Sequence, residues 1–137
     1  MDGFKVEVEA QVYPTEDVEK VKRAVGNLFE GELTVIQYPG GGVRALKGEG
    51  KSLDSLRSLK DILKRDRVRS AARAALTSGL SGKRITVYLN KQVALAKHVS
   101  FCGPELESPL GPITIKVEGE NPIEAIEWLV SRNEWSL

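Results

Sequence analysis

The chain has 137 residues, 41% hydrophobic and 28% charged, with one cysteine and a formal net charge of +1. This length allows a core that covers roughly two-thirds of the unfolded surface, so we expect one globular domain over residues 1–137 without a disulfide or structural metal. No apolar run approaches the ~20 residues of a membrane span and the N-terminus lacks a signal-peptide pattern, so we expect a cytoplasmic protein without membrane contact.

The N-terminal third predicts a strand, a helix and two further strands. Residues 4–13 alternate between apolar and polar side chains, which is typical of a strand buried on one face only. Thr15 is suited to cap a helix that runs to about Phe29. Residues 32–50 then predict two strands joined by the glycine-rich turn at 39–42.

Two helices are predicted in the middle of the chain. Ser52 can cap the first, in which leucines recur at helical spacing from Leu53 to Leu63. The second is expected to begin near Asp66, to place its alanines inward and to end in the glycine- and serine-rich residues 78–82.

The C-terminal third predicts strands and one helix. Residues 83–90 and 113–117 alternate as strands do, and the imperfect alternation between them indicates a bulge or a short helical turn near 93–96. Asn121 and Pro122 match the start of a last helix, with Asn121 as its cap. Together the elements predict an α+β fold, a two-layer sandwich in which helices pack on one face of a mostly antiparallel sheet.

Charge is distributed unevenly along the chain. Residues 51–84 hold ten Lys and Arg against three Asp, a net charge of +7, whereas the remainder has a net charge of −6. Within this block, Arg65, Arg69 and Arg73 recur every four residues and would form one stripe on a continuous helix. Guanidinium groups at that spacing can donate to successive phosphates of a nucleic acid. The alternative is a solvated helix face whose cations pair with neighbouring aspartates.

No set of residues in the sequence matches a catalytic or metal site. His98 and Cys102 make at most half of a tetrahedral metal site, and a single histidine with no identifiable acid gives no serine triad. The glycines at 40–42 lack the lysine and the following helix of a phosphate-binding loop, so we expect a hairpin turn there. We therefore expect no enzymatic activity, no cofactor and no metal.

The predicted strands offer little for base stacking. Among their polar-side positions only Tyr88 is aromatic, which argues against recognition of single-stranded RNA by the sheet face. Trp128 lies among apolar residues of the last predicted helix and is expected in the core.

Several stretches, in order along nearly the whole chain, resemble uncharacterised protein family 0201, a family of small archaeal proteins. The most specific are YLNKQ at 88–92 and SPLGPI at 108–113. The resemblance implies RNA binding, no established enzymatic activity, and an α+β sandwich similar to large-subunit ribosomal protein number five. The basic segment RDRVRSAAR at 65–73 departs from the family, which has a less basic helix there.

The sequence supports two hypotheses about function. The first is a non-enzymatic RNA-binding domain that contacts phosphates through its basic helical segment. The second is a homodimeric or partner-binding assembly module without affinity for nucleic acid. The candidate phosphate contacts of the first hypothesis are Lys60, Lys64, Arg65, Arg69, Arg73, Lys83, Arg84 and Lys91. Apart from Lys91, the loops at 90–92 and 108–112 are expected to be structural.

Overall fold

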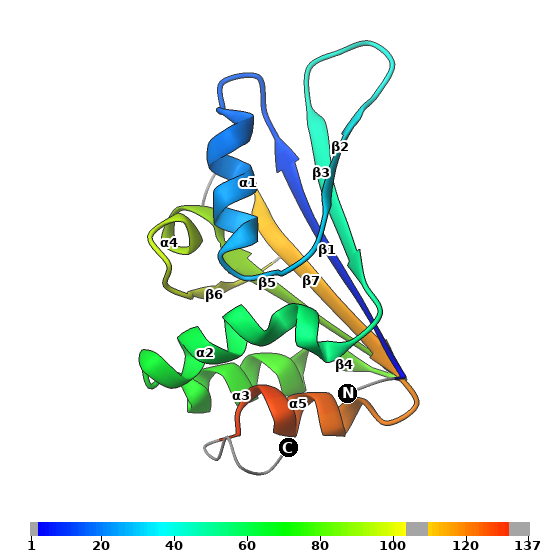
Figure 1. The fold of residues 1–137 in the computed structure, drawn as a ribbon, viewed down its shortest axis with the longest axis vertical. Helices are drawn as coiled ribbons and strands as arrows, with labels where there is room; N and C mark the ends of the chain where they lie inside the picture. The colour runs from blue at the N-terminus through cyan, green and yellow to red at the C-terminus, as the bar shows by residue number, and fades with distance from the viewer. Residues whose placement is uncertain (1–2, 104–109, 132–137) are drawn as a thin grey trace.

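The computed structural model describes residues 3–103 and 110–131, and Figure 1 shows the helices gathered on one side of an antiparallel sheet. The strands pair in the order β2-β3-β1-β7-β5-β4, and β6 pairs with β5. The strands are β1 (Phe4–Val12), β2 (Leu33–Gln37), β3 (Arg44–Gly50), β4 (Leu80–Ser81), β5 (Arg84–Asn90), β6 (Phe101–Cys102) and β7 (Pro112–Gly119). The helices are α1 (Val18–Gly26), the 3-10 helix η1 (Leu53–Leu56), α2 (Arg57–Arg65), α3 (Arg69–Ser78), α4 (Lys91–Leu95) and α5 (Pro122–Leu129). The predicted α+β sandwich is confirmed.

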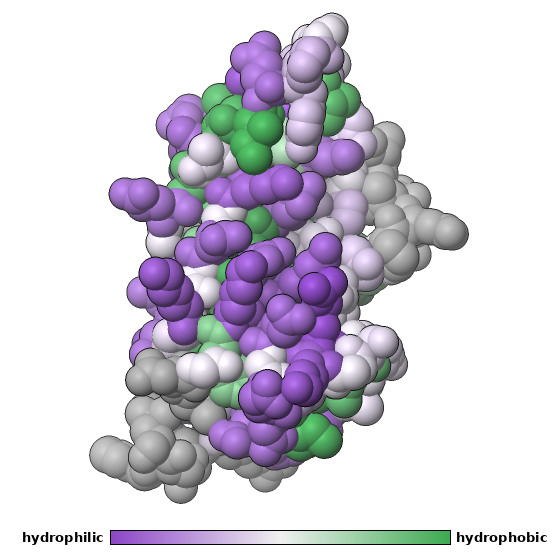
Figure 2. Space-filling model, turned by 90° about the vertical axis from the view of Figure 1, so that its right-hand side faces the viewer, coloured by the Kyte–Doolittle hydropathy of each residue, from purple (hydrophilic) through white to green (hydrophobic). Residues whose placement is uncertain are grey.

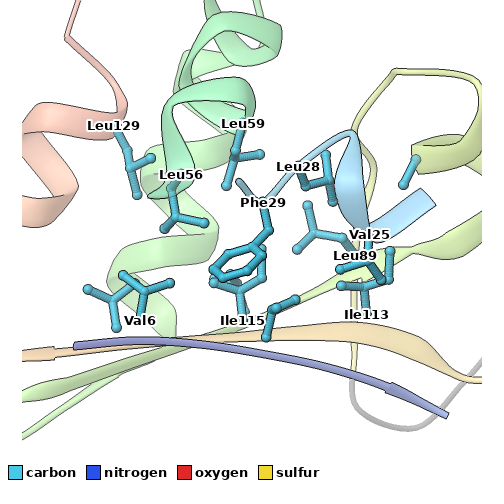
Figure 3. Packing of buried hydrophobic residues seen from close by; sticks show 14 of the residues in the cluster. Val6, Val25, Leu28, Phe29, Leu56, Leu59, Leu89, Ile113, Ile115 and Leu129 are labelled. Carbon is cyan, nitrogen blue, oxygen red and sulfur yellow. The ribbon is translucent and has the colours of Figure 1, made fainter. Parts of the chain in front are cut away.

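β1 lies between β3 and β7 and shows the predicted alternation. Its apolar side chains face the helices and are at most 6% exposed, whereas its polar side chains point to the opposite face of the sheet, called the open face below. Figure 3 shows Leu56, Leu59 and Phe29 packed over the strands on the helical side. The Phe29 ring comes so close to β3 that a Cβ at Gly48 would lie 2.7 Å from it, so only glycine fits there.

The predicted cap of the first helix is wrong by two residues. Asp17 is the N-cap of α1, and its carboxylate accepts a hydrogen bond from the Glu19 N–H at 2.9 Å. Thr15 instead lies in the preceding turn, which the Glu16 N–H closes onto the Tyr13 carbonyl at 2.9 Å. The turn therefore uses the residues that the sequence suggested for the helix start.

The third predicted helix begins at Arg69 rather than near Asp66. α2 ends in a Schellman motif, in which the Arg67 N–H donates to the Lys64 carbonyl and the Val68 N–H donates to the Leu63 carbonyl. Arg67 occupies the left-handed position with φ +57°. This turn separates α2 from α3, so the basic segment is not one continuous helix.

Residues 90–92 form a strand-to-helix junction. Asn90 ends β5 and caps α4, because its side-chain oxygen accepts the Val93 N–H at 3.0 Å. The predicted short helical turn is confirmed as α4. Pro122 opens α5 and Asn121 occupies its N-cap position, both as expected. The Asn121 side chain, however, donates to the Glu124 carboxylate at 3.0 Å instead of accepting a hydrogen bond from the helix backbone.

Trp128 is 7% exposed and belongs to the core, as predicted. Within residues 3–103 and 110–131, no helix has the length and apolar character needed to cross a bilayer.

Candidate nucleic-acid interface

The arginine stripe expected from the sequence is divided between two helices. Arg65 is the last residue of α2, whereas Arg69 opens α3 and Arg73 lies one turn further along it. Because the left-handed residue Arg67 separates the helices, the three guanidinium groups do not follow one helix face.

Arg65 is held in a cluster with the loop after α4. Its guanidinium donates to Asp66 at 2.9 Å and to the Lys97 carbonyl, and it lies 3.3 Å from His98 Nδ1. His98 Nδ1 is in turn 2.8 Å from the Asp66 carboxylate. The hydrogen bonds from Arg65 and then His98 lower the pKa of Asp66 to about 2. Arg65 therefore connects α2 to the loop after α4. Lys64, the candidate next to it in the sequence, is half-buried on α2.

His98 has Asp66 rather than Cys102 as its partner. The described part of the chain holds no group of three His, Cys, Asp or Glu side chains arranged to bind a metal.

Lys60 is inside the protein. It is 5% exposed, donates from Nζ to the Trp128 carbonyl at 2.7 Å, and lies 5.1 Å from the centroid of the Trp128 ring. The sequence contains a signal for this, since Lys60 is one helical turn from both Leu56 and Leu63 and so falls within the leucine stripe. We remove Lys60 from the candidate phosphate contacts because its ammonium group is enclosed.

Lys91 is also buried, at 7% exposure. Its Nζ donates to the carbonyls of Gln11 and Leu110 and pairs with the Glu16 carboxylate at 3.0 Å. Burial lowers the pKa of the Lys91 ammonium, and Glu16 opposes that effect. Lys91 thus joins α4 to β1, the loop before β7 and the turn before α1, and we remove it from the candidates as well. No local sequence pattern indicates this long-range role.

Lys83 and Arg84 are not part of the helical surface. Lys83 lies in the turn before β5 and pairs with Glu120 at 2.7 Å. Arg84 points to the open face, opposite in phase to buried Ile85, and pairs with Glu118 at 3.5 Å. Arg84 therefore lies on the face of the sheet opposite the helices, and Lys83 lies in the turn beside it.

The open face carries no excess of positive charge. Figure 2 shows it as largely hydrophilic. Its strand residues alternate in sign: Lys5, Lys47, Arg84 and Lys116 stand against Glu7, Glu9, Glu49 and Glu118. Ion pairs join Lys5 to Glu7 at 3.0 Å and Lys47 to Glu9 at 3.8 Å. A balanced face of this kind does not attract a polyanion.

Three arginines line an open hollow of about 670 Å³ beside α3. We call it the arginine hollow. It is lined by Arg67, Arg69, Ser70, Arg73, Ala74, Thr77, Ser78 and Val130. Within residues 3–103 and 110–131, Arg67 and Arg69 have no acidic partner. Arg67 is absent from the candidates drawn from the sequence, because a single helical stripe excludes position 67.

Arg73 is the third arginine of the hollow, and it has an acidic partner. Its guanidinium forms a two-pronged hydrogen bond with the Glu127 carboxylate of α5, at 2.6 and 3.2 Å. The pair raises the pKa of Arg73 and lowers that of Glu127, so both groups are charged at neutral pH. An anion in the hollow would compete with Glu127 for Arg73.

Comparison with known proteins identifies a matching family model, relatives and a similar solved structure. Residues 5–119 match a protein-family model described as RNA binding. The chain is 42% identical to a UPF0201 protein of Aeropyrum pernix over 126 residues, covering 91% of this chain and 83% of that protein. It is 40% identical to a UPF0201 protein of Thermococcus onnurineus over 130 residues, covering 95% and 93%. The crystal structure of a UPF0201 protein from Methanococcus jannaschii superposes with a TM-score of 0.81 at 31% identity, covering 92% of this chain and 98% of that one.

Proposed function

We propose that this chain, which belongs to the UPF0201 family, is a non-enzymatic RNA-binding protein that contacts RNA phosphates through the arginine hollow. The observation that supports this most is the convergence of Arg67, Arg69 and Arg73 on one open hollow, with no acidic partner for the first two among the described residues.

The hollow offers the donors that phosphate oxygens accept. A guanidinium group presents a planar fork of N–H donors that matches two phosphate oxygens, and it stays charged at any physiological pH. The hydroxyls of Ser70, Thr77 and Ser78 line the same hollow and add neutral donors of the kind that contact nucleic-acid backbones. The contact would depend on salt, because each neutralised phosphate releases counterions.

The lining residues favour backbone contact over base recognition. None of the described residues that line the hollow is aromatic, so it lacks a platform on which unpaired bases could stack. We therefore expect binding to follow the shape and phosphate spacing of structured RNA rather than its sequence.

A fluorescence-anisotropy titration tests this function. Nuclease-treated, salt-washed protein is titrated against a hairpin RNA and a single strand of equal length at two salt concentrations. The proposal predicts saturable binding that weakens steeply with salt and prefers the hairpin. Flat titrations with both RNAs at low salt would contradict it and would leave the assembly-module hypothesis, for which the edge strand β2 gives the best structural reason.

A further inference from the structure

β2 is an edge strand that lacks the usual protection against pairing. It is the last strand on its side of the sheet and bonds only to β3. Its sequence LTVIQ contains no charge and no proline, and three of its five residues are β-branched. Natural edge strands are commonly shielded by lysine, proline, a bulge or a covering element, since a bare edge is a template for another strand.

The side chains of β2 are also incompletely covered. Leu33 and Val35 point to the helical side and are only partly buried at the margin of the core, while Ile36 is half-buried on the open face. Tyr38, just beyond the strand, is 47% exposed. Figure 1 shows β2 and the loop that follows it standing clear of the helices. An added strand would remove this apolar margin from water on both faces of the sheet.

We propose that β2 pairs antiparallel with β2 of a second copy of this chain, so that the two sheets become continuous. Residues directly opposite each other in such a pair must lie on the same face of the sheet. The two-fold axis must therefore pass through a residue, and the central residue Val35 gives the longest overlap. In this register Val35 faces Val35, Thr34 faces Ile36 and Leu33 faces Gln37.

The register suits a second copy, because it places the β-branched residue Val35 against its own counterpart and brings no like charges together. No like charges meet along the strand, and just outside it Glu32 faces Tyr38 rather than another acid. An antiparallel pair of this kind has its axis perpendicular to the sheet, which keeps both helical layers on one side. Both arginine hollows would then lie on that side. Any role of this arrangement in RNA binding rests on the proposed function, whereas the dimer itself does not.

Light scattering on a size-exclusion column tests the interface. The wild type is expected at twice the chain mass of 15.0 kDa, and Ile36→Lys at 15.0 kDa, because the new ammonium group would lie opposite Thr34 of the other copy, next to the Lys47 that pairs with that threonine, and would find no acidic partner directly opposite it. Ile123→Lys is the matched control, since Ile123 is 55% exposed on α5, far along the chain from β2, and this variant should remain dimeric.

A charge-pair variant tests the register. In Thr34→Glu/Ile36→Lys, each new carboxylate would face the new ammonium group of the other copy, so the dimer lost in Ile36→Lys should be regained. A wild type that stays at 15.0 kDa up to its solubility limit would overturn the proposal, as would a dimer that Ile36→Lys leaves intact. A monomer that still binds RNA would overturn the dimer alone, and a dimer with no RNA affinity would overturn only the proposed function.

Discussion

Arg67 combines a strained backbone with a place in the arginine hollow. A non-glycine residue in the left-handed region destabilises the folded state by about 1–2 kcal/mol, and glycine removes this strain. Glycine also gives the unfolded chain more conformational entropy, which lowers stability by roughly 0.4–1 kcal/mol. Arg67→Gly should therefore raise the free energy of unfolding by about 0.5–1 kcal/mol in urea denaturation and weaken RNA binding. Arg67→Ala should weaken binding equally without the gain in stability. Equal RNA affinity for wild type and both variants would exclude Arg67 from the interface.

In the protein without RNA, the Arg73 guanidinium donates a hydrogen bond to the Glu127 carboxylate at 2.6 Å. Glu127→Gln removes the competing carboxylate and one unit of negative charge beside the hollow, so RNA affinity should rise severalfold at low salt. Glu124→Gln on the same helix is the control, because Glu124 bonds to Asn121 and does not line the hollow. If Glu127→Gln lowered the affinity, Glu127 would be a direct part of recognition rather than a competitor.

Lys60 belongs to the core rather than to the interface. Lys60→Met keeps most of the side-chain volume but leaves the Trp128 carbonyl without this donor, so it should cost about 1–3 kcal/mol of unfolding free energy by chemical denaturation. RNA affinity should stay at the wild-type value. A loss of affinity as large as that of Arg69→Ala, with stability unchanged, would contradict the burial of this lysine.

At the scale of elements, the junction between α2 and α3 depends on Asp66. Its folded-state pKa of about 2 lies below the ordinary aspartate pKa of 3.8, so the ionised carboxylate stabilises the fold above about pH 4, and this contribution is lost as pH falls toward 2. Thermal unfolding followed from pH 6 to pH 2 should show a smaller acid-induced decrease in Asp66→Asn than in wild type. Identical pH profiles would show that the cluster with Arg65 and His98 contributes nothing to stability.

The same junction shows what the sequence could and could not predict. Alternation in residues 4–13 was enough to place β1, and Pro122 was correctly expected to open the last helix. The break at Arg67 was missed because arginine carries no turn signal, whereas a glycine at that position would have given one. Local patterns specify elements, but a Schellman turn formed by an ordinary residue depends on what the flanking helices pack against.

At the scale of the whole molecule, the missing information was which cations share a face. The +7 segment is contiguous in sequence, yet Lys60 lies inside, Arg84 lies on the open face, and Arg69 and Arg73 lie on α3 and line the arginine hollow. Strand order determines this distribution, because β5 returns the chain to the sheet and turns Arg84 away from the helices. Net charge along the chain therefore predicted a cationic protein surface but not its position.

The salt dependence of RNA binding by two double variants tests the central claim most directly. Arg67→Ala/Arg69→Ala removes two cations from the arginine hollow, and Lys83→Ala/Arg84→Ala removes two that do not line it, so the net charge changes equally. If the hollow binds phosphates, the slope of log affinity against log salt should become shallower by about 2 in the first variant and change little in the second. Equal slopes in both variants, or a larger change in the second, would contradict the account.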